Sequence, residues 1–201
     1  MTGFGSATNV AQIRRGDSVV VIGCGGVGLN VIQGARIAGA AKIIAVDIHE
    51  GSLDRAKSFG ATDTILAHQA DRELREVARA VREFTDGRGA DYAFEATSIP
   101  ALAFVPLLMI RDGGLALQVS GINDPVSVPM PWFMWNKRYV TPLYGDCQPE
   151  RDFPRIFDHY TRGELKLDEL VSQTYCLEQL GEAFDDMLSG RNAKGVIVFD
   201  S

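Results

Sequence analysis

Uninterrupted apolar runs and helical apolar stripes alternate along the first half of the chain. The run Ser18–Ile22 is rich in β-branched residues, lies between Gly16 and Gly23, and lacks the polar alternation of a strand with one face in water. It therefore predicts a strand buried on both faces, as in a parallel sheet. From Val27 onward, apolar residues recur at the spacing of one helix face until Gly39, which predicts a helix that ends there.

The same alternation continues along the chain and defines the fold class. Strands separated by helices of this length form βαβ units with right-handed crossovers. No fixed-period repeat or linker interrupts residues 1–201, which are expected to form one α/β domain with a doubly wound, mostly parallel sheet. Asp71 and Arg75 are expected to pair across one helical turn, and residues 112–114 to form a turn. Further strands are predicted at 43–46, 62–66, 91–95, 115–119, 138–144, 171–175 and 195–199, and further helices at 71–84, 101–110, 154–160 and 177–188. A short helix with Leu53, Ala56 and Phe59 on its buried face is predicted to end at Gly60.

Composition and charge exclude several classes of function. Hydrophobic residues make up 46% and charged residues 23% of the 201 positions, as in ordinary globular domains. The net charge of -6 argues against binding to nucleic acid or to an anionic membrane surface. The longest apolar stretch, 100–110, is too short to span a bilayer. The start of the chain resembles no secretory signal and the three cysteines are scattered, so a cytoplasmic location is expected.

A glycine-rich hexapeptide, residues 23–28, joins the first predicted strand to the first predicted helix and fits the pattern G-x-G-x-x-G. In such a turn Gly23 permits the tight bend, Gly25 lets the backbone approach a diphosphate, and Gly28 lets the helix pack closely on the strand. The free N–H groups and the positive end of the helix can then hold a diphosphate without Lys or Arg. The alternative is a purely structural role, in which these glycines form a turn and bind no ligand.

Asp47 ends the second predicted strand about 20 residues after the glycine turn, where a dinucleotide site calls for an acid that accepts hydrogen bonds from a ribose diol. A carboxylate there would repel a 2′-phosphate, and no Arg follows it directly, so NAD is favoured over NADP. The alternative is that Asp47 caps a helix or stabilises a turn. Strand, glycine turn and spacing together favour the cofactor role.

Groups that could carry out alcohol chemistry are not evident. The spacing of the cysteines and histidines fits no metal-ligand motif, and no tyrosine has the Y-x-x-x-K spacing of a short-chain dehydrogenase, so neither catalytic nor metal-binding residues are assigned. Asp91 and Glu95, which bracket a predicted strand, are interpreted as its solvated ends.

Prolines and aromatic residues crowd the segment Trp132–Tyr144. One interpretation is an apolar loop that folds onto its own core. The other is a self-complementary dimer edge, because aromatic residues and Met are favoured in interface cores and Pro142 confines a strand to a sheet edge or bulge. The residues alone leave both open.

Several segments resemble the zinc-containing alcohol dehydrogenases of the medium-chain dehydrogenase/reductase superfamily. The resemblance covers essentially the whole chain and implies a Rossmann fold with a six-stranded sheet and NAD across its carboxyl edge. Ser52 departs from the pattern, since many relatives have Lys there. The segments that carry the resemblance are Thr2–Ala7, Gly16–Leu29, Val46–Ile48 and Ser189–Ile197.

The resemblance also implies roles for individual residues toward NAD. Thr2 would approach the nicotinamide, Gly26 and Val27 would donate N–H groups to the diphosphate, Asp47 and Ile48 would hold the adenosine, Ala96 and Thr97 would line the groove, Val119 would meet the carboxamide, and Lys194 would reach the diphosphate. With Gly23, Gly25 and Gly28 these residues form the predicted cofactor site.

In the family, a catalytic domain with the zinc ligands precedes this module, and its last zinc-binding Cys comes just before a T-G-x-G turn that matches Thr2–Gly5. The chain is therefore expected to be the NAD-binding module of a zinc-type alcohol or thiol-adduct aldehyde dehydrogenase, inactive on small alcohols or aldehydes by itself. The resemblance also favours a homodimer through Trp132–Tyr144. The alternatives are a zinc-free quinone or enoyl reductase, and a stand-alone nucleotide-sensing or dimerisation module.

Overall fold

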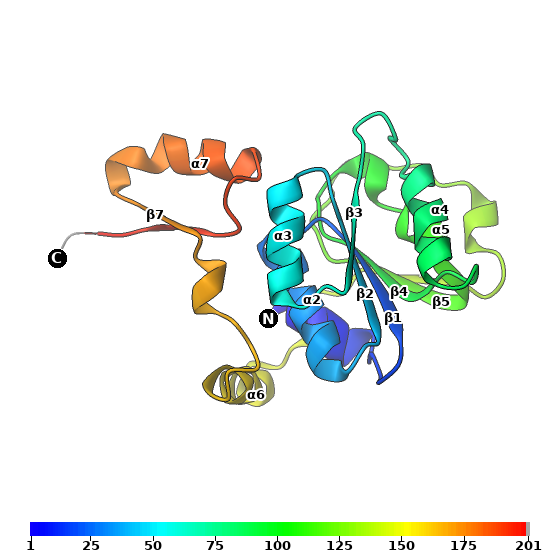
Figure 1. The fold of residues 1–201 in the computed structure, drawn as a ribbon, viewed down its shortest axis with the longest axis horizontal. Coiled ribbons are helices and arrows are strands. Elements are labelled where there is room, and N and C mark those ends of the chain that lie inside the picture. Colours follow the sequence, from blue (N-terminus) through cyan, green and yellow to red (C-terminus); the bar gives the residue numbers. More distant parts are fainter. Residues whose placement is uncertain (200–201) are drawn as a thin grey trace.

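A six-stranded parallel sheet forms the centre of the computed structural model, which describes residues 1–199 (Figure 1). The strand order is β3-β2-β1-β4-β5-β6, so the predicted doubly wound Rossmann sheet is confirmed. The last two residues of the predicted 1–201 domain lie outside the described part. The strands are β1 (Ser18–Ile22), β2 (Lys42–Asp47), β3 (Asp63–Leu66), β4 (Ala90–Glu95), β5 (Ile110–Gln118) and β6 (Arg138–Val140).

Helices cover both faces of the sheet, with α2 and α3 on one side and α4 and α5 on the other (Figure 1). The α-helices are α1 (Thr2–Gly5), α2 (Gly26–Ala38), α3 (Glu50–Phe59), α4 (Arg75–Phe84), α5 (Pro106–Met109), α6 (Pro149–Thr161) and α7 (Leu180–Leu188). A π-helical turn, η1 (Ser6–Val10), and 3-10 turns η2 (Pro100–Leu102), η3 (Met130–Phe133), η4 (Tyr144–Asp146), η5 (Asp168–Leu170) and η6 (Leu177–Gln179) complete the helical segments.

The central strand β1 explains why its sequence is apolar without interruption. Val19 and Val21 pack with α2 and α3, whereas Val20 and Ile22 pack with α4 and α5. Each of these four side chains is buried. Because a parallel strand between two helical layers has no wet face, its polar alternation is lost. This is the physical basis of the fold prediction.

Several helices begin at different residues from those predicted, and for two of them a local contact gives the reason. The helix predicted at 71–84 begins at Arg75, because the Asp71 carboxylate accepts hydrogen bonds from the backbone N–H groups of Arg75 and Glu76 and caps it. The predicted Asp71–Arg75 ion pair is therefore wrong, and Arg75 pairs with Glu73. The helix predicted at 154–160 begins at Pro149, whose missing N–H costs nothing in the first turn.

Four further local predictions are corrected. The stretch 101–110 forms only η2 and the short α5, and β5 already begins at Ile110. The predicted turn at 112–114 lies inside β5, beside a register shift between Ala90 and Tyr92. The strand predicted at 138–144 ends at Val140, two residues before Pro142, which has no N–H to donate. The expected T-G-x-G turn is the helix α1, which packs on α2.

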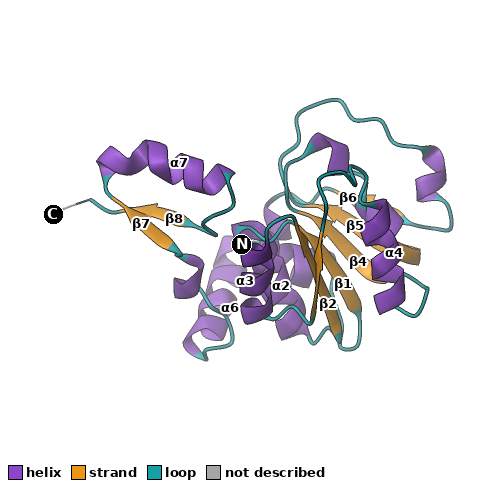
Figure 2. Ribbon diagram, turned by 45° about the horizontal axis from the view of Figure 1, so that its top comes forward, coloured by secondary structure: helices purple, strands orange, loops and turns teal. Residues whose placement is uncertain are grey.

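The C-terminal unit, residues 171–199, forms a separate small body on the far side of α3 from the main sheet (Figure 1). Its strands β7 (Gln173–Tyr175) and β8 (Gly195–Ile197) pair in parallel with each other, and α7 lies along them (Figure 2). Large apolar side chains of α7, including Leu180, Phe184 and Leu188, are exposed. Among the described residues, no helix combines the length and apolarity needed to cross a membrane.

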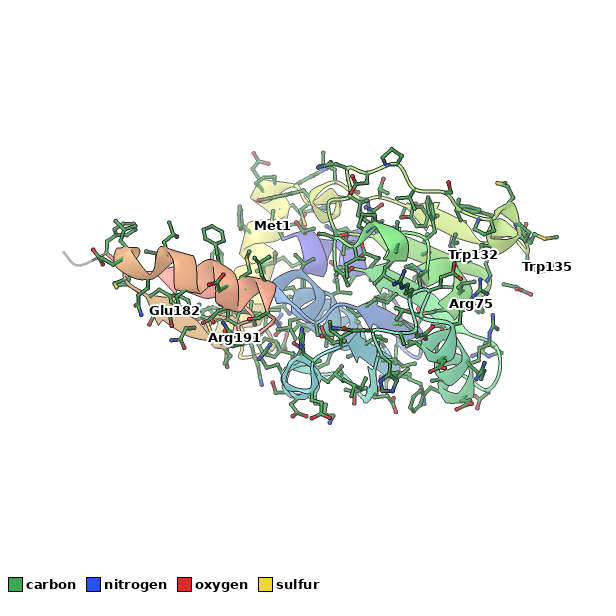
Figure 3. The ribbon with its side chains drawn as sticks, turned by 90° about the horizontal axis from the view of Figure 1, so that it is seen from above. Met1, Arg75, Trp132, Trp135, Glu182 and Arg191 are labelled. Carbon is green, nitrogen blue, oxygen red and sulfur yellow. The ribbon has the colours of Figure 1, made fainter. Side chains whose placement is uncertain are left out.

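The segment Trp132–Tyr144 contains both side chains that pack on the core and side chains that are exposed. Trp132 and Phe133 are half-buried and pack on the core, where Phe133 and Tyr139 form an aromatic cluster with Phe104. Arg75 lies over the Trp132 ring at 5.6 Å, while Trp135 points outward (Figure 3). Trp132, Phe133 and Tyr139 thus pack on the core, as the loop interpretation expects. Trp135 and Leu143, which precede and follow the edge strand β6 in the sequence, are exposed.

Candidate functional site

The carboxyl ends of the central strands bring the predicted site residues to one edge of the sheet. Gly23 follows β1, Asp47 ends β2 and Glu95 ends β4. Since β2 and β4 flank β1 on opposite sides, the chain leaves β1 at the point where the strand order reverses. Ligands of open α/β sheets bind at such switch points.

The glycine turn adopts a conformation that other residues could not share. Gly23 has φ +90°, and a Cβ there would lie 2.7 Å from the Thr97 side chain. A Cβ on Gly28 would lie 1.9 Å from the Gly23 carbonyl oxygen, so helix α2 could not approach the strand. A Cβ on Gly25 would meet no protein atom within 4 Å. Gly25 therefore faces open space, as a backbone that receives a ligand would.

The N-terminus of α2 offers unsatisfied backbone donors to this space. Gly25 is its N-cap residue, and no side chain among the described residues caps the helix. The first N–H groups of a helix have no intrahelical acceptor and carry the positive end of its dipole. The geometry fits an anion such as a diphosphate.

A cleft of about 430 Å³ opens in front of this turn, between α3 and the C-terminal unit. Of the predicted cofactor residues, it brings together Gly25, Gly26, Val27, Asp47 and Lys194. The sequence did not predict most of the other lining residues, because they come from α3 and the C-terminal unit, which are far apart in the sequence and adjacent only in the folded chain. The remaining lining residues are Asn30, His49, Ser52, Arg55, Leu170, Met187, Gly190, Asn192 and Ala193.

A second, apolar pocket of about 80 Å³ adjoins the cleft, and Asp47 lines both. It holds three further predicted residues, Gly23, Ile48 and Thr97. The other four predicted positions, Thr2, Gly28, Ala96 and Val119, line neither space. A flat apolar group could lie in this pocket while a polar group occupied the cleft.

Asp47 makes the backbone contact of a turn acid and still has room to bind a cofactor, so its contacts are compatible with both roles considered for it. Its carboxylate accepts hydrogen bonds from the backbone N–H of His49, two residues on, at 3.0 Å, and from that of Cys24 at 2.8 Å. The first contact is that of a turn acid and the second fixes the glycine turn. Each carboxylate oxygen has a second acceptor position, which leaves capacity for a ligand.

Arg55 is the main residue of the cleft that the sequence pattern did not reveal. It follows Ser52 by three residues, so both lie on one face of α3, and its Nη2 donates to Ser52 Oγ at 3.1 Å and to Gly190 O at 3.0 Å. Helical spacing from Ser52 is a signal that could have found it. Arg55 thus brings a positive charge to α3 three positions after Ser52, where many relatives have Lys.

Glu95 corrects another interpretation, since its side chain is 0% exposed rather than solvated. It accepts hydrogen bonds from the Thr97 backbone N–H and hydroxyl, both at 2.5 Å, and from the Ser120 hydroxyl. It thereby fixes the loops after β4 and β5 at the switch point. Burial, aided by the Glu95 charge, raises the pKa of nearby Tyr139 to about 12.

Asp91, at the opposite end of β4, is also bound rather than free in solvent. It accepts hydrogen bonds from Arg111 at 2.6 Å and from the Ser18 backbone and hydroxyl at 2.8 Å. Burial alone would raise its pKa, but these hydrogen bonds outweigh burial and leave the pKa below its usual value. Asp91 stabilises the amino end of β1 and β4, far from the cleft.

Metal-ligating side chains do not converge in the part of the chain that the structure describes. No group of three His, Cys, Asp or Glu residues there could hold a metal ion. The cysteines are free, and burial raises the pKa of the Cys24 thiol strongly. Cys24 therefore acts as a packing residue beneath the glycine turn.

Comparison with known proteins agrees with this geometry. The profile of the zinc-binding dehydrogenase family matches residues 26–161. Alcohol dehydrogenase-like 5 of Arabidopsis thaliana is 33% identical over 98% of this chain and 50% of its own length. An alcohol dehydrogenase zinc-binding domain protein from Burkholderia ambifaria has a TM-score of 0.88 at 31% identity, over 100% of this chain and 53% of its own. Benzyl alcohol dehydrogenase from Acinetobacter calcoaceticus also has a TM-score of 0.88, at 27% identity over 99% and 54% of the two chains.

These matches place the chain in the class of α/β dehydrogenases. The chain belongs to the zinc-containing alcohol dehydrogenase family, and the family profile begins at Gly26, inside the glycine turn, and covers β2 to β6. The chain spans about half the length of the curated relatives it matches.

Proposed function

We propose that this chain is the NAD-binding module of a zinc-type alcohol dehydrogenase, or of a thiol-adduct aldehyde dehydrogenase, acting on small alcohols or aldehydes. The observation that carries the proposal is the open space in front of Gly25, at the uncapped end of α2 and within reach of Asp47. Backbone donors there would hold the diphosphate, and Asp47 would accept from the adenosine ribose. Bound NAD would supply the hydride acceptor.

For the remaining predicted residues we propose the roles that the family resemblance implies. Ile48 would border the adenine in the apolar pocket, and Lys194 would neutralise the diphosphate. Ala96, Thr97 and Val119 follow β4 and β5 at the switch point, on the path toward the nicotinamide, which Thr2 would also approach. Residues 1–201 would then form one cofactor module, whose zinc-binding catalytic domain lies outside this chain.

Two features support a module that works with other protein surfaces. The exposed apolar side chains of α7 are unusual for an isolated domain and favour contact with another part of the parent protein. The edge strand β6 and the exposed end of Trp132–Tyr144 favour a homodimer. The free cysteines agree with a cytoplasmic location.

Titration with NADH and NADPH, followed by nicotinamide fluorescence, tests the cofactor assignment. We expect saturable NADH binding at least about tenfold tighter than NADPH binding, because Asp47 would repel the 2′-phosphate. Equal affinities would remove the role of Asp47. Binding of neither nucleotide would remove the module itself.

Metal analysis of the full-length protein tests the enzyme class. Near-stoichiometric zinc is expected, and its absence would favour the zinc-free quinone or enoyl reductase. The stand-alone sensing module is favoured instead if the genomic reading frame begins at Met1 without an upstream domain rich in Cys and His.

A further inference from the structure

Arg55 holds unused hydrogen-bonding capacity inside the cleft. Its Nε is buried, and no described residue accepts a hydrogen bond from it. Only Nη2 has partners, the Ser52 hydroxyl and the Gly190 carbonyl, and no described carboxylate lies within ion-pair distance. A ligand in the cleft does not reach the buried Nε, but Nη1 also has no acceptor among the described residues. An acceptor brought by a ligand would satisfy this second free donor.

The two existing hydrogen bonds fix where the guanidinium lies. Ser52 is buried on α3, and Gly190 belongs to the loop after α7, which packs against His49 so closely that a Cβ on Gly190 would lie 2.7 Å from the His49 ring. Arg55 therefore bridges the two walls of the cleft instead of extending into solvent. Lys194, the other fully charged cation lining the cleft, is exposed.

The charges of Arg55 and Asp47 both act on the Cys24 thiol, in the glycine turn. Burial is the main reason that the pKa of Cys24 is raised, and the Asp47 charge raises it further while the Arg55 charge opposes this. Both groups thus act on the first residues of the glycine turn. A carboxylate only accepts hydrogen bonds and a guanidinium only donates them.

A ribose diol requires both kinds of partner, because each hydroxyl donates one hydrogen bond and also accepts. We propose that Arg55 is a binding residue for the adenosine ribose, donating to a hydroxyl oxygen of the diol while Asp47 accepts from it. This inference rests on the proposed function, because it requires the adenosine half of the dinucleotide to occupy this cleft. Arg55 would add affinity for the diol and would couple its binding to the position of the Gly190 loop.

Calorimetric titration with ADP and with 2′,3′-dideoxy-ADP tests the proposal. Arg55→Gln, which removes the charge but keeps a polar side chain, is expected to weaken ADP binding about tenfold and dideoxy-ADP binding less than twofold. Lys57→Gln is the matched control, since Lys57 is exposed on the same helix and, among the described residues, its ammonium group pairs with Asp54 alone. It should change neither constant by as much as twofold.

Each outcome separates this inference from the proposed function. If the wild-type chain binds ADP and Arg55→Gln weakens both nucleotides equally, Arg55 acts on the phosphates or on the fold and the diol role is wrong. Unchanged ADP binding by Arg55→Gln also overturns it. Failure of the wild-type chain to bind ADP counts against the proposed function instead. If Arg55→Gln does not fold by thermal melting, Arg55→Lys, which keeps the charge without the planar fork, should show a diol-dependent loss of about threefold.

Discussion

Asp47 brings to the cleft a negative charge and acceptor positions on both carboxylate oxygens, and an isosteric amide lacks the charge and half of those acceptors. Asp47→Asn is therefore expected to weaken NADH binding by about 1–2 kcal/mol, the scale of hydrogen bonds to a charged acceptor. NADPH binding should change less or improve, because the repulsion of the 2′-phosphate disappears. Fluorescence titration of both nucleotides measures the two changes.

Asp54→Asn provides the control for this prediction. Asp54 carries the same charge on α3, but it is exposed and pairs only with Lys57. Its substitution should leave both affinities within about twofold of the wild type, because exposed charges are screened by solvent. An Asp47→Asn variant that binds NADH as tightly as the wild type would contradict the assigned role.

Two glycines of the same turn are expected to respond to alanine in opposite ways. Gly28→Ala should destabilise the fold by about 1–3 kcal/mol, because its Cβ would overlap the Gly23 carbonyl. Gly25→Ala should leave the melting temperature nearly unchanged, because Gly25 has φ -77° and open space around it, but it should weaken NADH binding. Thermal melting and NADH titration of both variants separate packing from ligand approach.

The sequence predicted these residues because their signals are local. A glycine turn between a strand and a helix, with an acid at the end of the next strand, carries its steric reasons within about 25 residues of chain. Arg55 and Glu95 escaped prediction for the opposite reason. Arg55 depends on Gly190, 135 positions away, and Glu95 on Ser120, 25 positions away. Whether a charged side chain is buried is decided by such distant contacts.

At the scale of elements, Asp152 joins α6 to the N-terminal segment. The buried carboxylate accepts hydrogen bonds from the Gln148 backbone at 2.8 Å and from Asn9 at 3.4 Å, and it pairs with Arg151 and Arg155. The hydrogen bond from Arg151, with further help from Gln148 and the arginine charges, outweighs burial and holds the pKa of Asp152 below its usual value. The ionised carboxylate therefore stabilises the N-terminal turn of α6 and also accepts the hydrogen bond from Asn9.

This contact predicts a dependence of stability on acid pH. Because the folded-state pKa is lowered, the stabilisation is complete above the ordinary carboxyl pKa of 3.8 and is lost as pH falls through the lower folded value. Asp152→Asn should lower the free energy of unfolding at pH 7, and the difference from the wild type should shrink below about pH 4. Urea unfolding across that range measures it. A difference that stays constant into acid would show that Asp152 does not act through its charge.

Element existence was predictable from the sequence, but element ends were not. The periodicity of apolar residues predicted the six strands of the main sheet and the helices between them, because buried faces repeat with the geometry of each element. The ends depend on single contacts, as where the Asp71 carboxylate starts α4 and Pro142 follows the end of β6. The separate sheet of β7 and β8 was not predicted, because three-residue strands carry no periodicity that assigns a partner.

At the scale of the whole molecule, large exposed apolar side chains occur on the C-terminal unit and beside β6. Trp135 and Glu182 of α7, one from each region, lie at opposite ends of the molecule (Figure 3). Beside β6, Trp135 is 68% and Leu143 is 90% exposed. An unpaired parallel edge with aromatic neighbours is self-complementary under a two-fold axis, because each copy offers the same donors, acceptors and apolar side chains. The proposed dimer would bury this surface.

Charge placed on this surface is expected to separate the two copies. Trp135→Asp with Leu143→Asp should convert the dimer to a monomer in light scattering coupled to size exclusion, because each interface would then bury unpaired carboxylates. The melting temperature of the monomeric unit should change little, since both side chains are already exposed within one chain. Leu188→Asp, on α7 and 79% exposed, is the matched control and should leave the mass unchanged. A double variant that keeps the dimer mass, or loss of the dimer in the control alone, would move the interface from β6 to the C-terminal unit.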